Sequence, residues 1–180
     1  KAPLLNYQQR SILQKVTRKL MESGQLDYLS KTADYDGFYQ TLLNWLQEVK
    51  RSGQSPKKWL SLFTDSEKEK ELGLIYQEYE NFLDTNGLVD AESNYQLLID
   101  KINSSSEILN GLDLLVVDGF YKLSRIQLDL IETVAEHGVE VLVYTYLEEE
   151  RDKLFLSSKE MITPLKDEID WQIKEISQIE

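Results

Sequence analysis

The first part of the chain repeats apolar residues three and four positions apart, which is the pattern of helices that bury one face. Five such stretches lie within residues 6–105, and glycines or polar clusters separate them. The second stretch places on one stripe Phe38, Leu42, Trp45, Leu46 and Val49. We therefore expect an essentially helical region up to about residue 105.

Capping residues mark several boundaries of these helices. Asp34 or Asp36 can cap the second helix, and Ser55 followed by Pro56 opens a short third one. Asp90 is a candidate cap for the fifth helix. The third helix is expected to bury Trp59, Leu60 and Phe63, and the fifth to present Tyr95, Leu98, Ile99 and Ile102.

The pattern changes near Ile108, where strands are predicted. Leu112–Asp118 contains a continuous apolar run, which is typical of a parallel strand buried on both faces. Ser124–His137 reads as a helix with a Ser-x-x-Gln capping box, and Val139–Tyr146 as a second strand. A strand, a helix and a strand within so few residues predict a βαβ unit whose two strands are parallel.

The predicted fold class is α/β, with a large all-helical insertion joined to part of a parallel-sheet domain. The predicted divisions are 1–107 for the helical region, 108–156 for the βαβ unit and 157–180 for a C-terminal helix. That last helix opens at Thr163-Pro164 and carries one apolar stripe, formed by Leu165, Ile169, Ile173 and Ile176. Because no stop signal follows this stripe, we interpret the chain as an excised fragment.

Charge and composition narrow the classes of function. The chain has 20 basic and 32 acidic residues, a formal charge of −12, which disfavours autonomous binding to a phosphate backbone. Basic residues gather in two groups that fit the solvent faces and ends of helices: Lys15, Arg18 and Lys19, and then Lys50, Arg51, Lys57 and Lys58. Cysteine is absent, and no apolar run is long enough to span a bilayer. We expect a soluble, cytoplasmic protein with no membrane partner. The single histidine, His137, is expected at a helix end in a structural role.

Asp118 is the candidate functional residue, because it follows the first strand at the edge where α/β proteins bind ligands. It can be a magnesium or nucleotide aspartate, or a residue that bonds the amides of the following turn. Gly119 cannot position a water molecule, and no Gly-x-x-x-x-Gly-Lys-Ser/Thr loop occurs. The run Glu148–Asp152 is interpreted as solvated charge.

Residues 76–93 and 114–134 together resemble superfamily 1 helicases of the UvrD and AddAB type. The matching positions are Tyr79, Gly87, Leu88, Asp90, Asp118 and Gln127. Asp118-Gly119-Phe120, in place of an Asp-Glu box, resembles the B subunit of the bacterial ATP-dependent helicase/nuclease, AddB or RexB. Residues 36–60 look like the helical insertion of that subunit.

This resemblance implies a P-loop helicase-like region that no longer works as a motor, with residues 1–107 as a helicase 1B-like insertion. It implies a scaffold role in DNA double-strand-break repair, a helicase–nuclease A-type subunit as partner, and DNA bound through the full complex. The fragment itself would not be an enzyme, whereas its parent would be a subunit of an ATP-dependent deoxyribonuclease. ATP with Mg²⁺ and an iron–sulfur cluster are implied for the parent, with Asp118 the only candidate here for nucleotide or metal.

Two departures and two alternatives remain at this point. The phosphate-binding loop is missing, and Thr145-Tyr146 stands where active helicases have Gly-Asp. One alternative is a fragment of an active ATP-dependent DNA helicase. The other is a stand-alone acidic helical module for protein interaction, which the helical first part and the negative charge suggest.

Overall fold

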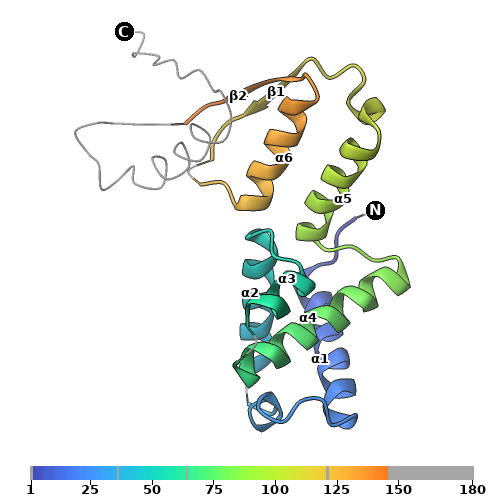
Figure 1. Ribbon diagram of the computed structural model, residues 1–180, viewed down its shortest axis with the longest axis vertical. Helices are drawn as coiled ribbons and strands as arrows, with labels where there is room; N and C mark the ends of the chain where they lie inside the picture. The colour runs from blue at the N-terminus through green and yellow to red at the C-terminus, as the bar shows by residue number, and fades with distance from the viewer. Residues whose placement is uncertain (1, 36, 64, 121, 146–180) are drawn as a thin grey trace, which may run out of the picture. The chain divides into compact units, whose positions relative to one another are not determined.

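A computed structural model describes residues 2–35, 37–63, 65–120 and 122–145 (Figure 1). In chain order the elements are α1 (Asn6–Glu22), η1 (Leu29–Lys31), α2 (Phe38–Arg51), α3 (Pro56–Leu62), α4 (Glu67–Asn86), α5 (Ala91–Ser104), η2 (Ser106–Leu109), β1 (Leu114–Val117), α6 (Arg125–Glu136) and β2 (Glu140–Val143). The described residues form two compact units, which divide between Leu98 and Ile99. The predicted C-terminal helix and the acidic run at 148–152 lie outside the described residues.

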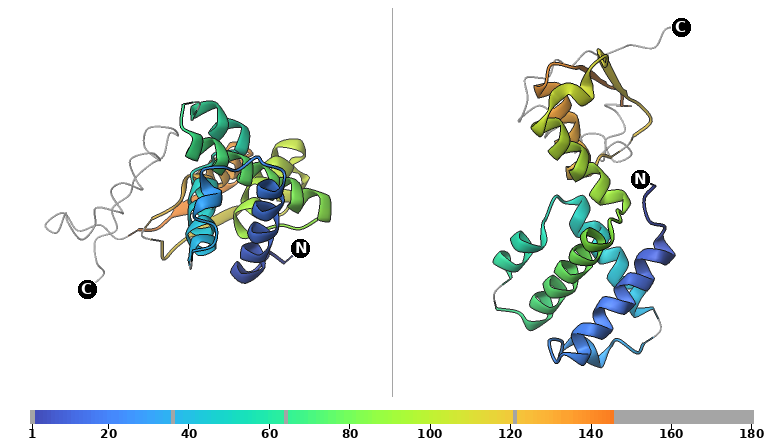
Figure 2. Two further views of the ribbon diagram at one scale, coloured as in Figure 1. Left: turned by 90° about the horizontal axis from the view of Figure 1, so that it is seen from below. Right: turned by 90° about the vertical axis from the view of Figure 1, so that its right-hand side faces the viewer.

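The first unit is a helical bundle in which α4 packs against both α1 and α3, and α1 against α2 (Figure 2). Its core forms because the apolar stripes of these helices face one another. The most deeply buried apolar side chains are Leu13, Leu43, Leu46, Ile75, Tyr79 and Leu83. The stripe predicted for the second helix is therefore confirmed as part of one core.

Local boundaries follow the predicted caps in part. The Ser55 hydroxyl accepts the Lys58 amide at 3.2 Å and caps α3 as predicted. The predicted Asp34 cap of α2 is wrong, because Gly37, with φ +86°, occupies the cap position and no side chain bonds the helix end. Asp36 lies outside the described residues.

Two predictions of burial are wrong. Phe63 is 36% exposed because α3 ends at Leu62 and its side chain lies beside Trp59 at the margin of the bundle. Leu98 on α5 is likewise 36% exposed. The capping of α5 by Asp90 is confirmed, since the Asp90 carboxylate accepts the Ser93 amide at 2.7 Å.

The second unit contains the predicted βαβ arrangement. β1 and β2 are parallel, in a register that pairs Leu114 with Glu140 and Val117 with Val143. The predicted parallel pair is thus confirmed, and the described chain is mostly helical with a small parallel sheet. Helix α6 covers one face of this sheet (Figure 1). The side chains in that contact are Leu123, Leu128, Ile131, Val117, Val141 and Val143.

The other face of the two strands is exposed, which corrects the prediction of a strand buried on both faces. Burial alternates along both strands, and Leu114 and Val116 are 42% and 50% exposed. The continuous apolar run in the sequence therefore marks a strand of which only one face is covered within the described residues. No helix in the described ranges has the length and apolar character to cross a membrane.

Candidate functional site

Asp118 lies directly after β1 and its side chain is exposed to solvent. One carboxylate oxygen, Oδ1, accepts the Gly119 amide at 2.7 Å, and Gly119 adopts φ +78°. A positive φ is favourable for glycine and strained for other residues, so Gly119 suits this turn. The geometry is that of an aspartate bonding its own turn.

The neighbouring strand ends beside Asp118 without supplying further acidic ligands. The Tyr144 amide donates to the Val117 carbonyl at 2.8 Å, so Tyr144 follows the last pair of the sheet. Within residues 2–145, as far as the structure describes them, no group of three acidic, histidine or cysteine side chains could hold a metal. Among these described residues, Asp118 therefore belongs to no set of converging metal ligands.

Gln127, which the helicase resemblance singles out, lies in the capping box of α6. Its Oε1 accepts the Ser124 amide at 2.9 Å and lies 3.0 Å from the Ser124 hydroxyl. The predicted Ser-x-x-Gln box is confirmed. At the other end of α6, Nδ1 of His137 lies 2.8 Å from the Thr133 carbonyl, at the predicted helix end. Both side chains are engaged in holding the helix.

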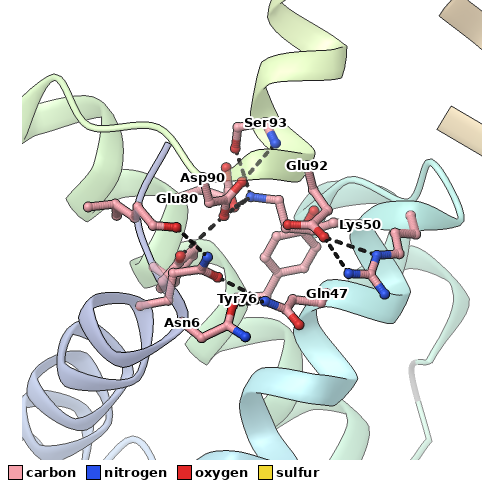
Figure 3. Close-up of polar contacts among 12 residues, drawn as sticks. Asn6, Gln47, Lys50, Tyr76, Glu80, Asp90, Glu92 and Ser93 are labelled. Carbon is pink, nitrogen blue, oxygen red and sulfur yellow. Dashed lines mark hydrogen bonds and ion pairs between the residues drawn. The ribbon is translucent and has the colours of Figure 1, made fainter. Parts of the chain in front are cut away.

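A second cluster, buried in the first unit, was not predicted. The ammonium of Lys50, from α2, lies 2.6 Å from Asp90 Oδ2, 2.7 Å from Glu80 Oε1 and 2.7 Å from the Ser93 hydroxyl (Figure 3). The prediction that Lys50 lies on a solvent face is wrong, since its side chain is only 6% exposed. We call Lys50, Glu80, Asp90, Ser93 and Tyr79 the Lys50 cluster.

The Lys50 cluster joins three separate helices, because a lysine on one helix contacts acidic and hydroxyl groups on the other two. Lys50 comes from the end of α2, Glu80 and Tyr79 from α4, and Asp90 from the cap of α5. The Tyr79 hydroxyl donates to Asp90 Oδ2 at 3.1 Å, and the Lys50 ammonium lies 5.5 Å from the Tyr79 ring centroid. Asp90, 1% exposed, is thus bonded on both oxygens. Such full pairing is what a buried carboxylate requires.

The pKa values of the two carboxylates in the Lys50 cluster are shifted in opposite directions. Burial raises the pKa of Asp90, but the Lys50 charge and the hydrogen bonds from Lys50 and Ser93 more than offset this, leaving the pKa below its ordinary value. For Glu80 burial dominates and raises the pKa despite the Lys50 charge. Burial, with the Asp90 charge beside it, strongly raises the pKa of Tyr79.

Further polar contacts surround the Lys50 cluster (Figure 3). Arg51 pairs with the buried Glu92 carboxylate at 2.9 Å. The Tyr76 hydroxyl donates to the Gln54 carbonyl at 2.8 Å, and burial raises the pKa of Tyr76 well above its usual range. Since the Lys50 ammonium has three protons and three oxygen partners, none is left for a substrate. The cluster is built as a structural junction.

One residue of the Lys50 cluster could be predicted from the sequence. Asp90 follows the turn Gly87-Leu88-Val89, and the sequence predicts it as a helix cap. Lys50 gave no such signal, because a lysine in the last turn of a helix is ordinarily solvated. Only the packing of α2 against α4 and the start of α5 brings its ammonium to the two carboxylates.

An open groove of about 680 Å³ lies between α1 and α4 and contains the first group of basic residues. Lys19 pairs with Glu78 at 2.9 Å and is exposed, while the Lys15 ammonium lies 4.9 Å from the Phe82 ring centroid. These contacts agree with the interpretation of a solvated helix face.

Comparison with known proteins gives one family. The family model described as "ADDB, N-terminal" matches residues 5–178, almost the whole chain. No curated protein matches the chain. The match covers the helical first unit as well as the β1–α6–β2 unit with Asp118. The chain therefore belongs to the AddB N-terminal family.

Proposed function

We propose that this chain is the helicase-like N-terminal part of an AddB-type subunit and serves as a non-catalytic scaffold. The parent complex would be an ATP-dependent helicase and deoxyribonuclease of double-strand-break repair and recombination. The family match over residues 5–178 is the observation that carries this proposal. We also propose that β1, α6 and β2 belong to a P-loop helicase-type sheet, which their parallel pairing supports.

The end of β1 supports a non-catalytic role. In phosphoryl transfer, an aspartate at this place holds Mg²⁺ and a neighbouring residue positions the attacking water. Here Gly119 follows Asp118 and has no side chain for that task. Asp118 directs one oxygen to the Gly119 amide. The side chains present at this strand end therefore do not fit an ATP and Mg²⁺ site by themselves.

The parent's other cofactor and its partners follow from the same proposal. An iron–sulfur cluster needs cysteine ligands, and the 180 residues contain none, so its ligands would come from another part of the parent. The proposed partner is the helicase–nuclease A-type subunit, which would supply the motor. DNA would be bound by the complete complex, since this chain carries a formal charge of −12.

The test is made in the parent protein assembled with its A-type subunit. Asp118→Ala is expected to leave DNA-stimulated ATP hydrolysis and unwinding unchanged, whereas replacing the phosphate-loop lysine of the A-type subunit abolishes both. Asp113→Ala, an exposed acid just before β1, is the matched control. Loss of ATP hydrolysis with Asp118→Ala, but not with Asp113→Ala, would favour the fragment of an active helicase.

A stand-alone interaction module remains the second candidate because residues 1–98 form a compact unit with their own core. The two proposals differ in whether unwinding by the A-type subunit depends on the parent protein of this chain. A scaffold subunit co-purifies with the A-type subunit in a fixed ratio and supports unwinding only in that complex. An independent module would leave unwinding by the A-type subunit unchanged when the whole parent is omitted.

A further inference from the structure

The open face of the β1–β2 pair is an apolar surface that the described residues leave uncovered. It is formed by Leu114, Val116, Leu142 and Tyr144, each between 36% and 50% exposed. Helix α6 occupies the opposite face (Figure 1). Parallel sheets are normally covered on both faces, and contiguous apolar surface of this kind marks a docking site.

The sequence that follows β2 offers a matching apolar surface. Residues 163–180 lie outside the described residues, and their sequence repeats apolar residues four, four and three positions apart, at Leu165, Ile169, Ile173 and Ile176. At 100° per residue these positions fall within one narrow stripe. Asp167 and Lys174 fall on the opposite side. A stripe of this kind needs an apolar surface to cover it.

The lengths of the two surfaces agree. Eleven helical steps from Leu165 to Ile176 would span about 17 Å. The stretch from Glu140 to Tyr144 spans roughly 13 to 17 Å as extended strand. The 18 residues between Tyr144 and Thr163 can reach up to about 59 Å, which is ample to bring the segment to the open face.

We propose that residues 163–180 dock on the open face of the β1–β2 pair, with the Leu165–Ile176 stripe against Leu142 and Val116. The sheet would then have α6 on one side and this segment on the other. A second copy of the chain is a poorer occupant, because each copy carries a formal charge of −12 and two such copies repel each other.

The chain lends itself to a cross-linking test because it contains no cysteine. The double variant Leu142→Cys with Ile173→Cys is treated with a short bismaleimide at low protein concentration. The matched control is Leu142→Cys with Asp167→Cys, which places the second thiol on the side of the helix opposite the stripe. Docking raises the effective concentration of the facing thiol, so we expect about tenfold more intramolecular product in the first pair.

Each other outcome contradicts the proposal. Equal yields in the two pairs would mean that the segment does not present its stripe to the sheet. Products that link two chains would assign the face to a second copy. Absence of any cross-linked product would mean that residues 163–180 do not cover this face.

Hydrogen exchange provides a second readout that does not depend on the cysteine variants. In Ile169→Asp with Ile173→Asp we expect faster exchange of the β1 and β2 amides and unchanged exchange in α1 and α4. Lys166→Ser with Lys174→Ser serves as control and should change neither. Unaltered protection of the strands in the aspartate variant would overturn the proposal.

Discussion

The Lys50 cluster and the open face of the β1–β2 pair show two different ways in which an α-helical or α/β unit is completed. Within residues 1–98, every charged member of the Lys50 cluster has a partner, and the apolar stripes of α1, α2 and α4 cover one another. The β1–β2 pair has one covered face and one face with exposed Leu114 and Val116. In the first region, described residues of the same unit pair these charges and cover these apolar stripes. In the second region, one apolar face of the strand pair is left uncovered by the described residues.

The largest effect expected in this comparison comes from Lys50→Met. The substitution would leave the buried Asp90 and the partly buried Glu80 without their cation, and breaking one partner of a buried pair such as Lys50–Asp90 costs about 3–5 kcal/mol. Urea unfolding measured by tryptophan fluorescence in a Trp171→Phe background would report on Trp45 and Trp59 in the first unit. Lys57→Met, at an exposed position, should change the free energy of unfolding little. Equal values for the two variants would show that the cluster does not support the bundle.

A comparison of buried and exposed leucines separates the two regions next. Leu46→Ala removes a fully buried side chain from the core of the first unit and should cost about 2–5 kcal/mol. Leu142→Ala removes a side chain of the open face that is 36% exposed among the described residues, and docking of residues 163–180 on that face would bring its cost towards the same range. Unfolding in urea measures both. A cost for Leu142→Ala below about 0.5 kcal/mol would show that the open face stays exposed in solution, against the proposed docking.

The pH dependence of unfolding sharpens the description of the Lys50 cluster. The folded pKa of Asp90 is lowered, so its contribution to stability is present above the unfolded pKa of about 3.9 and is lost as pH falls through the folded value. The folded pKa of Glu80 is raised, so its contribution is present below about 4.3 and is lost as pH rises through the folded value. The two carboxylates therefore act in opposite directions.

Glu80→Gln tests this opposition. This substitution should remove the loss of stability that Glu80 causes as pH rises above about 4.3. The loss of stability that Asp90 causes as pH falls should remain. Urea unfolding across about pH 3–8 measures both. Glu67→Gln, in the first turn of α4, is the control. If Glu80→Gln instead steepened the fall in stability above pH 5, the raised pKa of Glu80 would be wrong.

The features that could be predicted from the sequence are those determined by residues close together along the chain. The helical stripes, the caps at Ser55 and Asp90 and the parallel β1–β2 pair were predicted because spacing and capping residues act within a few positions. Gly37 took the place of the predicted Asp34 cap because glycine can adopt the positive φ of that turn.

The missing predictions concern tertiary structure. Lys50 was assigned to solvent because its burial depends on Asp90 and Glu80, 40 and 30 residues further along the chain. The apolar run of β1 predicted burial on both faces, but residue type reports a tendency to be covered and does not identify the covering element. For Asp118 the sequence left two interpretations, and its bond to the Gly119 amide supports the turn residue.

The smallest effect on the free energy of unfolding is expected at Asp118, at the end of β1. Its carboxylate is exposed and bonds only the adjacent amide among the contacts described, so Asp118→Ala should change the free energy of unfolding by less than about 0.5 kcal/mol. Gly119→Ala should cost about 1 kcal/mol, because alanine is strained at the φ of +78° that glycine adopts there. Thermal or urea unfolding of both variants would show that this strand end is held by its backbone conformation. Because Asp118→Ala is expected to fold normally, any loss of ATP hydrolysis that it caused in the assembled parent complex would have to arise from the aspartate itself.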